Sequence, residues 1–190
     1  MENLAIDQVA QAFCHATKNT LEKGIGKKVN FVKTIQSIPR VSIRPDIGCF
    51  VQFSGDYNGL VALTFSSAAA LHVYRNYMTT MGLPAEELVN DATSAEVADT
   101  IGEITNQIMG RAMRMVEAKF DLNSYFGQPK ALSLSNGISL VPEASNTNSM
   151  SDNSEDCIFD NRRIVFKLED SSRFYLEIAM ERIEFIMLES

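Results

Sequence analysis

The sequence is poor in the residues that make metal sites and covalent cross-links. It has two histidines, His15 and His72, and three cysteines, Cys14, Cys49 and Cys157, with no CxxC spacing. This odd, scattered set predicts neither a zinc site nor a disulfide framework, so we expect reduced thiols. A Ser or Cys nucleophile would need a His base, but neither histidine stands in a recognisable signature such as GxSxG.

Basic residues are scarce relative to acidic ones. Lys and Arg number 17 against 24 Asp and Glu, which gives a formal net charge of -7 at pH 7. Binding to a nucleic-acid backbone needs clustered Lys and Arg that neutralise phosphates. We therefore expect no nucleic-acid partner, because an acidic surface repels one.

Long apolar runs are also missing, and we expect no leader. No run of about 18 apolar residues occurs, and residues 1–10 lack a basic segment followed by a hydrophobic stretch. We expect no membrane insertion and a cytoplasmic protein. Residues 24–28 superficially resemble a phosphate-binding loop, but the GxxxxGK[ST] spacing is absent, and we interpret Gly24 as a helix stop.

The remaining pattern predicts a mixed fold. Apolar residues at helical spacing predict helices over residues 3–23, 68–81 and 93–119, with Thr93 and Glu96 as a capping box for the last. Runs of β-branched and aromatic residues predict strands over 29–36, 47–53, 60–65, 130–141, 162–168 and 173–180. Asn136-Gly137 predicts a hairpin within the fourth run. This order favours an α+β fold, mainly an antiparallel β-sheet with helices packed on one face.

The chain length of 190 residues suits one good core, so we expect a single domain over residues 1–190. Within it, residues 142–161 are rich in Ser, Asn, Asp and Glu. Such a segment buries too little apolar surface to offset the entropy of ordering it, and we expect a mobile polar loop. Residues 183–188 are expected to extend the last strand.

The helix predicted over residues 93–119 organises the rest of the chain. At 100° per residue, one side of it carries an apolar stripe, made of Val97, Ala98, Ile101, Ile104, Ile108, Ala112 and Met115. The opposite side carries Asp99, Glu103, Asn106, Gly110 and Glu117. An interior Gly costs a helix about 1 kcal/mol relative to Ala, which a flat patch for close approach would explain. On its own, an exposed Glu-x-x-Asn pair indicates only a solvated helix face.

The spacing of four residues along the sequence suggests a function for this helix face. Asp99, Glu103 and Asn106 in the pattern D-x3-E-x2-N, followed after 22 residues by Pro129, resemble the full signature of the CheC, CheX and FliY phosphatases of bacterial chemotaxis. The hairpin over residues 55–63 is also similar to theirs. CheC-like members carry two such helices and this chain carries one, so it is most similar to CheX.

The resemblance implies hydrolysis of the aspartyl phosphate of a CheY-type response regulator. It implies that Asn106 positions the attacking water and that Glu103 docks on the regulator's active-site lysine. Asp99 and Gly110 are candidate partner contacts, and Pro129 is expected to begin a strand. The phosphatase would need no cofactor of its own, because the regulator supplies Mg²⁺, and a homodimer is implied.

Two alternatives to a phosphatase remain open at this point. The first is a non-catalytic CheX-like binding module that docks a signalling or flagellar-switch partner through the same helix. The second is a purely structural component of a dimer. Neither composition nor periodicity separates these from the enzyme.

Overall fold

The computed structural model of the chain describes residues 4–140, 142 and 159–186. Its helices are α1 (Ala5–Ile25), α2 (Ser67–Thr80) and α3 (Ala95–Phe120), with a short 3-10 turn η1 (Ala85–Glu87). Its strands are β1 (Asn30–Phe31), β2 (Gln36–Ser37), β3 (Val41–Ile43), β4 (Ile47–Gly55), β5 (Gly59–Phe65), β6 (Ser124–Phe126), β7 (Lys130–Ser133), β8 (Ile138–Leu140), β9 (Phe159–Lys167) and β10 (Arg173–Glu181).

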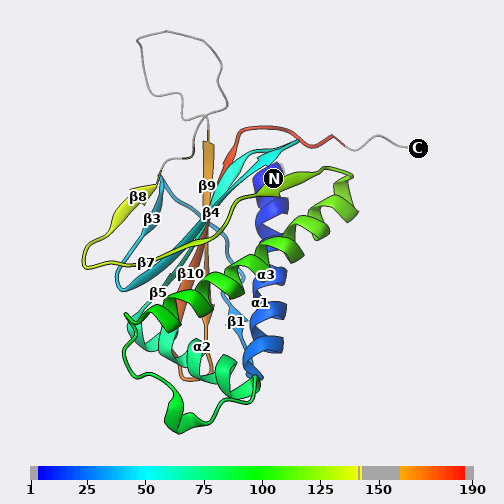
Figure 1. Ribbon diagram of the computed structural model, residues 1–190. Helices are drawn as coiled ribbons and strands as arrows, with labels where there is room; N and C mark the ends of the chain where they lie inside the picture. The colour runs from blue at the N-terminus through cyan, green and yellow to red at the C-terminus, as the bar shows by residue number, and fades with distance from the viewer. Residues whose placement is uncertain (1–3, 141, 143–158, 187–190) are drawn as a thin grey trace.

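Most of these strands form one antiparallel sheet. Its order is β1-β9-β10-β5-β4-β6, with β2 also pairing β9 and β7 also pairing β4. Strands β3 and β8 pair with each other in a separate small sheet. Figure 1 shows the three helices on one side of the main sheet and the β3–β8 pair on the other. The predicted α+β fold with helices on one face is therefore confirmed, with an additional small sheet on the opposite face.

The main core fills the space between the sheet and the helices. Alternate residues of β4 and β5 point into it, which is the period of two that a strand imposes: Ile47, Cys49, Val51, Phe53, Val61, Leu63 and Phe65. A second, smaller cluster lies under the β3–β8 pair and includes Val41, Ile43, Leu60, Ala62 and Ala179. The helices are thus held on the sheet by apolar burial, the dominant favourable contribution to folding.

The helix boundaries differ from the sequence prediction by one or two residues. The Oγ of Ser94 accepts the Val97 N–H (3.4 Å) and caps α3, so the predicted Thr93 cap is wrong. Thr93 instead donates its N–H and its hydroxyl to the Asp91 carboxylate. At the end of α1, the left-handed conformation falls on Gly26, with φ 62°, and not on Gly24.

Three other expectations are corrected by the bounds and the pairing of the strands. The strands on either side of Asn136-Gly137 do not form a hairpin, because β7 pairs with β4 and β8 pairs with β3. The last strand ends at Glu181, and Phe185 beyond it packs its ring against Phe120. Most of the predicted polar loop lies outside the described residues, but its last part, from Phe159 on, belongs to β9.

The start of α2 is fixed to the start of β4 by one carboxylate. The N–H and the hydroxyl of Ser67 both donate to Oδ2 of Asp46, at 2.7 Å each. These hydrogen bonds from Ser67 hold the pKa of the Asp46 carboxyl below its usual value. The Oγ of Ser66 caps the same helix by accepting the Ala69 N–H at 3.3 Å.

The Asp46→Asn variant is expected to lower the free energy of unfolding at neutral pH by about 1–2 kcal/mol, because a hydrogen bond to a charged group becomes a weaker neutral one. A carboxyl with a depressed folded-state pKa stabilises the fold above its unfolded-state pKa, about 3.9 for Asp, and loses that contribution as the pH falls through the folded-state value. Urea unfolding should therefore show a difference that is full at neutral pH and shrinks in acid.

Ser66→Ala provides the matched control for this experiment. It removes a cap of the same helix without removing a titratable group, so its difference from wild type should not vary with pH. An Asp46→Asn difference that persists undiminished in acid would contradict the role assigned to the carboxylate.

Candidate functional site

The candidate site lies on the side of α3 that faces away from the sheet. Asp99, Glu103 and Asn106 are all exposed on this side. The opposite side is buried, and of the predicted apolar stripe only Ala98 and Met115 are not fully buried. The buried residues are Val97, Thr100, Ile101, Ile104, Thr105, Ile108, Met109, Ala112, Met113 and Val116. Because this stripe is packed in the core, α3 cannot rotate, and the direction of the polar side chains is fixed.

A hollow of about 330 Å³ lies over the N-terminal half of α3. Its lining residues come from the helix and from the segment that enters β7: Ala98, Asp99, Gly102, Glu103, Asn106, Gln128, Pro129 and Ala131. All four residues of the spaced signature therefore meet at one hollow, although the last is far from the others in sequence. The register of β7 explains this, since it pairs with β4 from Lys130 onward beside the helix.

Glu103 has a hydrogen-bond partner four residues further along the same helix. The Nε2 of Gln107 donates to Oε1 of Glu103 at 3.0 Å and to the Tyr77 hydroxyl at 3.2 Å. By contrast, no described residue forms a hydrogen bond with the side chain of Asn106. The carboxamide of Asn106 can thus offer one acceptor and two donor positions to a bound molecule.

Two glycines of α3 have different surroundings. A Cβ at Gly102 would meet nothing within 4 Å, so this residue leaves open space in the hollow. A Cβ at Gly110 would lie 3.8 Å from Nη1 of Arg114 and 4.0 Å from Cζ of Phe126. The predicted flat patch at Gly110 is therefore bordered by the Phe126 ring, and Gly110 does not line the hollow.

Sequence reasoning missed Gly102, Gln128 and Ala131 as lining residues, and it placed Ala98, which also lines the hollow, in the buried stripe. The interior position of Gly102 in an otherwise regular helix was a usable signal, because Gly is costly there. Gln128 carried no such signal, since its place at the hollow depends on the pairing of β7 with β4. Pro129 was expected only to begin a strand, and it also lines the hollow directly before β7.

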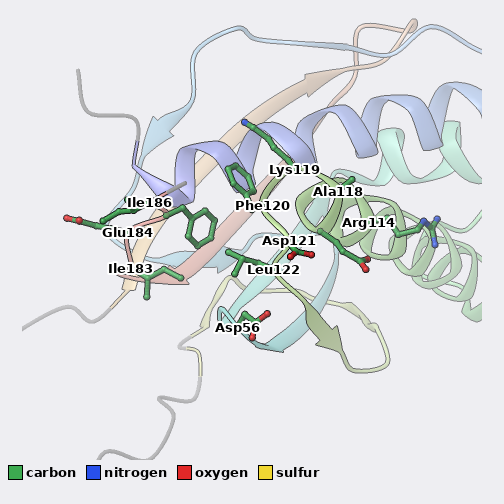
Figure 2. A pocket seen from close by; sticks show the side chains of 12 residues that line it. Asp56, Arg114, Ala118, Lys119, Phe120, Asp121, Leu122, Ile183, Glu184 and Ile186 are labelled. Carbon is green, nitrogen blue, oxygen red and sulfur yellow. The ribbon is translucent and has the colours of Figure 1, made fainter. Parts of the chain in front are cut away.

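A second hollow, of about 1060 Å³, lies at the other end of α3 (Figure 2). Its walls include Phe120, Leu122 and Ile183, and none of the four signature residues lines it. Lys119 points away from Asp121 in this view, and its Nζ donates to Oε1 of Gln8. The larger hollow is thus separate from the smaller one, which the four signature residues line.

Within the part of the chain that the structure describes, no group of three or more His, Cys, Asp or Glu side chains is arranged to hold a metal ion. None of the helices in this part is long and apolar enough to cross a membrane.

The fold is shared with chemotaxis proteins of known structure. CheX from Desulfovibrio desulfuricans has a TM-score of 0.70 and 19% identity, over 92% of this chain and 99% of that one. CheX from Vibrio vulnificus gives the same values. A chain of the CheX–CheY–BeF3–Mg²⁺ complex from Borrelia burgdorferi has a TM-score of 0.56 and 17% identity, over 90% of this chain and 97% of that one.

These likenesses place the molecule in the class of proteins with the CheX/CheC-like fold, as the signature predicted. No curated protein matches the sequence. The family model described as "Protein of unknown function (DUF3334)" matches residues 2–190. The chain belongs to the DUF3334 family.

The open hollow can be tested through the stability of glycine variants. Gly102→Ala is expected to raise the free energy of unfolding by up to about 1 kcal/mol, because Ala favours a helix and its methyl group meets no other atom. Gly48→Ala is the contrasting variant, since its Cβ would lie 1.8 Å from Cγ2 of Ile43. It should destabilise the protein by about 1–3 kcal/mol through overpacking. If urea unfolding showed that Gly102→Ala is less stable than wild type, the space beside Gly102 would not be open as described.

Proposed function

We propose that this protein is a phosphatase that hydrolyses the aspartyl phosphate of a CheY-type response regulator. The observation that carries the proposal is the meeting of Asp99, Glu103, Asn106 and Pro129 at one hollow on an exposed helix face. The fold supports it, because a chain of a CheX–CheY–BeF3–Mg²⁺ complex is similar to this one. The proposed location is the cytoplasm.

The charge of the hollow supports a substrate that neutralises its own phosphoryl group. Among the described residues, the lining includes the carboxylates Asp99 and Glu103 but no Lys, Arg or His. Two carboxylates repel a free phosphate ester, and catalysis of phosphoryl transfer depends on cations beside the transferring group. A response regulator brings Mg²⁺, a lysine and the leaving carboxylate with it, so the phosphatase needs no cofactor of its own.

The phosphatase then has only to position the attacking water and the regulator relative to each other. Asn106 would hold the attacking water through its free carboxamide, in line with the phosphorus and the leaving oxygen. Glu103 would pair with the regulator's active-site lysine and so dock the regulator over the hollow. Correct placement of two reactants alone removes several kcal/mol from a barrier. A helix fixed by its buried face is a suitable support, because both side chains keep a constant separation.

The test follows the loss of phosphate from each CheY-type regulator of the source organism, phosphorylated with acetyl phosphate and then freed of donor. The wild-type protein should accelerate this loss. Asn106→Ala should reduce kcat about 100-fold, because an unpositioned water rarely attacks in line. Glu103→Ala should mainly raise KM, since it removes a docking contact made before the chemical step.

Asn19→Ala is the matched control, because Asn19 is an exposed helical Asn on α1 that does not line the hollow. It should behave as wild type. Equal decay rates with wild type, with Asn106→Ala and with the regulator alone would overturn the phosphatase proposal. Binding of the regulator without faster decay would favour the alternative, a non-catalytic CheX-like module.

We also propose a homodimer formed through a sheet edge. Strands β6 and β7 end the sheet beyond β4, and there Tyr125 is 77% exposed and Leu132 is 37% exposed. Sedimentation velocity should show a dimer, and the double variant Tyr125→Lys with Leu132→Lys should shift it toward monomer, because charged residues on an edge oppose strand pairing. A wild-type protein that stays monomeric at high concentration would contradict this.

A further inference from the structure

We infer that Gln107 and Tyr77 are positioning residues that hold the Glu103 carboxylate ready for its partner. The inference rests on the proposed function and explains how the Glu103 side chain is restricted before the regulator binds. It follows from a chain of contacts that begins on α1, passes through α2 and ends at the hollow on α3.

The contact between Gln107 and Glu103 has a defined direction. The two residues are four apart on α3, so their side chains are neighbours on the helix surface. An ionised carboxylate only accepts hydrogen bonds, so the NH₂ group of Gln107, and not its carbonyl oxygen, must face Glu103. The Nε2 donates to Oε1 of Glu103 at 3.0 Å and to the Tyr77 hydroxyl at 3.2 Å. Each of its two hydrogens therefore has one acceptor.

Tyr77 is itself fixed by the backbone of α1. Its half-buried ring packs against the main core. A Cβ at Gly24 would lie 3.0 Å from both Cδ2 and Cε2 of this ring, so the ring lies directly against the helix at that glycine. The absence of a side chain at Gly24 lets Tyr77 approach, and the hydroxyl is thereby held at a fixed height beside α3.

The consequence for Glu103 is a restricted side chain with one free oxygen. Only Oε1 is hydrogen-bonded to another described residue, which leaves Oε2 available to a cationic group such as a lysine ammonium. A free Glu side chain loses much rotamer freedom when it is immobilised on binding. Gln107 and Tyr77 restrict the Glu103 side chain before binding, so we expect them to raise the affinity for the regulator. Neither forms a hydrogen bond with Asn106, so the chemical step should be little affected.

The kinetic test is a double-mutant cycle with phosphorylated regulator. Gln107→Ala should raise KM about two- to tenfold, the effect of immobilising one flexible side chain on binding, with kcat nearly unchanged. In a Glu103→Ala background the same substitution should have no effect, because the group that it positions is gone. Tyr77→Phe keeps the ring against Gly24 and should raise KM by a smaller factor. Gln11→Ala, an exposed helical Gln on α1, is the control.

A second measurement needs no regulator. In ¹⁵N- and ¹³C-labelled protein, the side-chain NH₂ signals of Gln107 should shift in Glu103→Ala and in Tyr77→Phe. The side-chain couplings of Glu103 should show a loss of its preferred rotamer in Gln107→Ala. Unmoved signals, or equal rotamer populations in wild type and variant, would overturn the inference. So would additive KM effects in the cycle. A wild-type protein that leaves regulator decay unchanged would overturn the proposed phosphatase, and the NMR result would still decide whether Gln107 orders Glu103.

Discussion

The burial of one side of α3 against the main sheet is the constraint on which the rest of this structure depends. The helix has 26 residues, and its inner side is in the core along almost its whole length. Such a helix cannot turn about its axis without exposing Ile101, Ile104 and Ile108 to water, at a cost of about 1.5–3 kcal/mol for each side chain. The outward direction of Glu103 and Asn106 is therefore a result of hydrophobic packing and not of any contact among the polar residues.

A second constraint brings the rest of the site to this helix. The wall of the hollow opposite Glu103 and Asn106 contains Gln128 and Pro129, and their place is set by the pairing of β7 with β4. The same sheet fixes α2, because Asp46, beside β4, holds Ser67 at the start of that helix. Sheet pairing and helix packing thus determine the hollow together, and neither would form it alone.

These two constraints explain which features the sequence could predict. Periodicity separated most of the buried and exposed residues of α3, because helix geometry is local, but it placed Ala98, which lines the hollow, in the buried stripe. It missed Thr100 and Thr105 on the buried side, whose hydroxyls donate to the carbonyl oxygens of Glu96 and Ile101 and so can enter the core. The capping box failed because Asp91 competes for Thr93, a local contact that the motif does not encode. The hollow, the β3–β8 sheet and the role of Gly24 beside Tyr77 depend on contacts between distant residues, which one sequence does not reveal.

Under the proposed function, the hollow would suit a protein substrate better than a small phosphate ester. Its lining, within the part of the chain that the structure describes, has no cationic side chain, and Glu103 and Asn106 are exposed when nothing is bound. A small ester would leave these groups in water, where hydrogen bonds and charges have little catalytic effect. A protein that covers the hollow would exclude this water and bring the missing positive charge. Docking would then create the environment that catalysis needs, and an ordered Glu103 would matter because it binds the covering partner with a smaller loss of side-chain freedom.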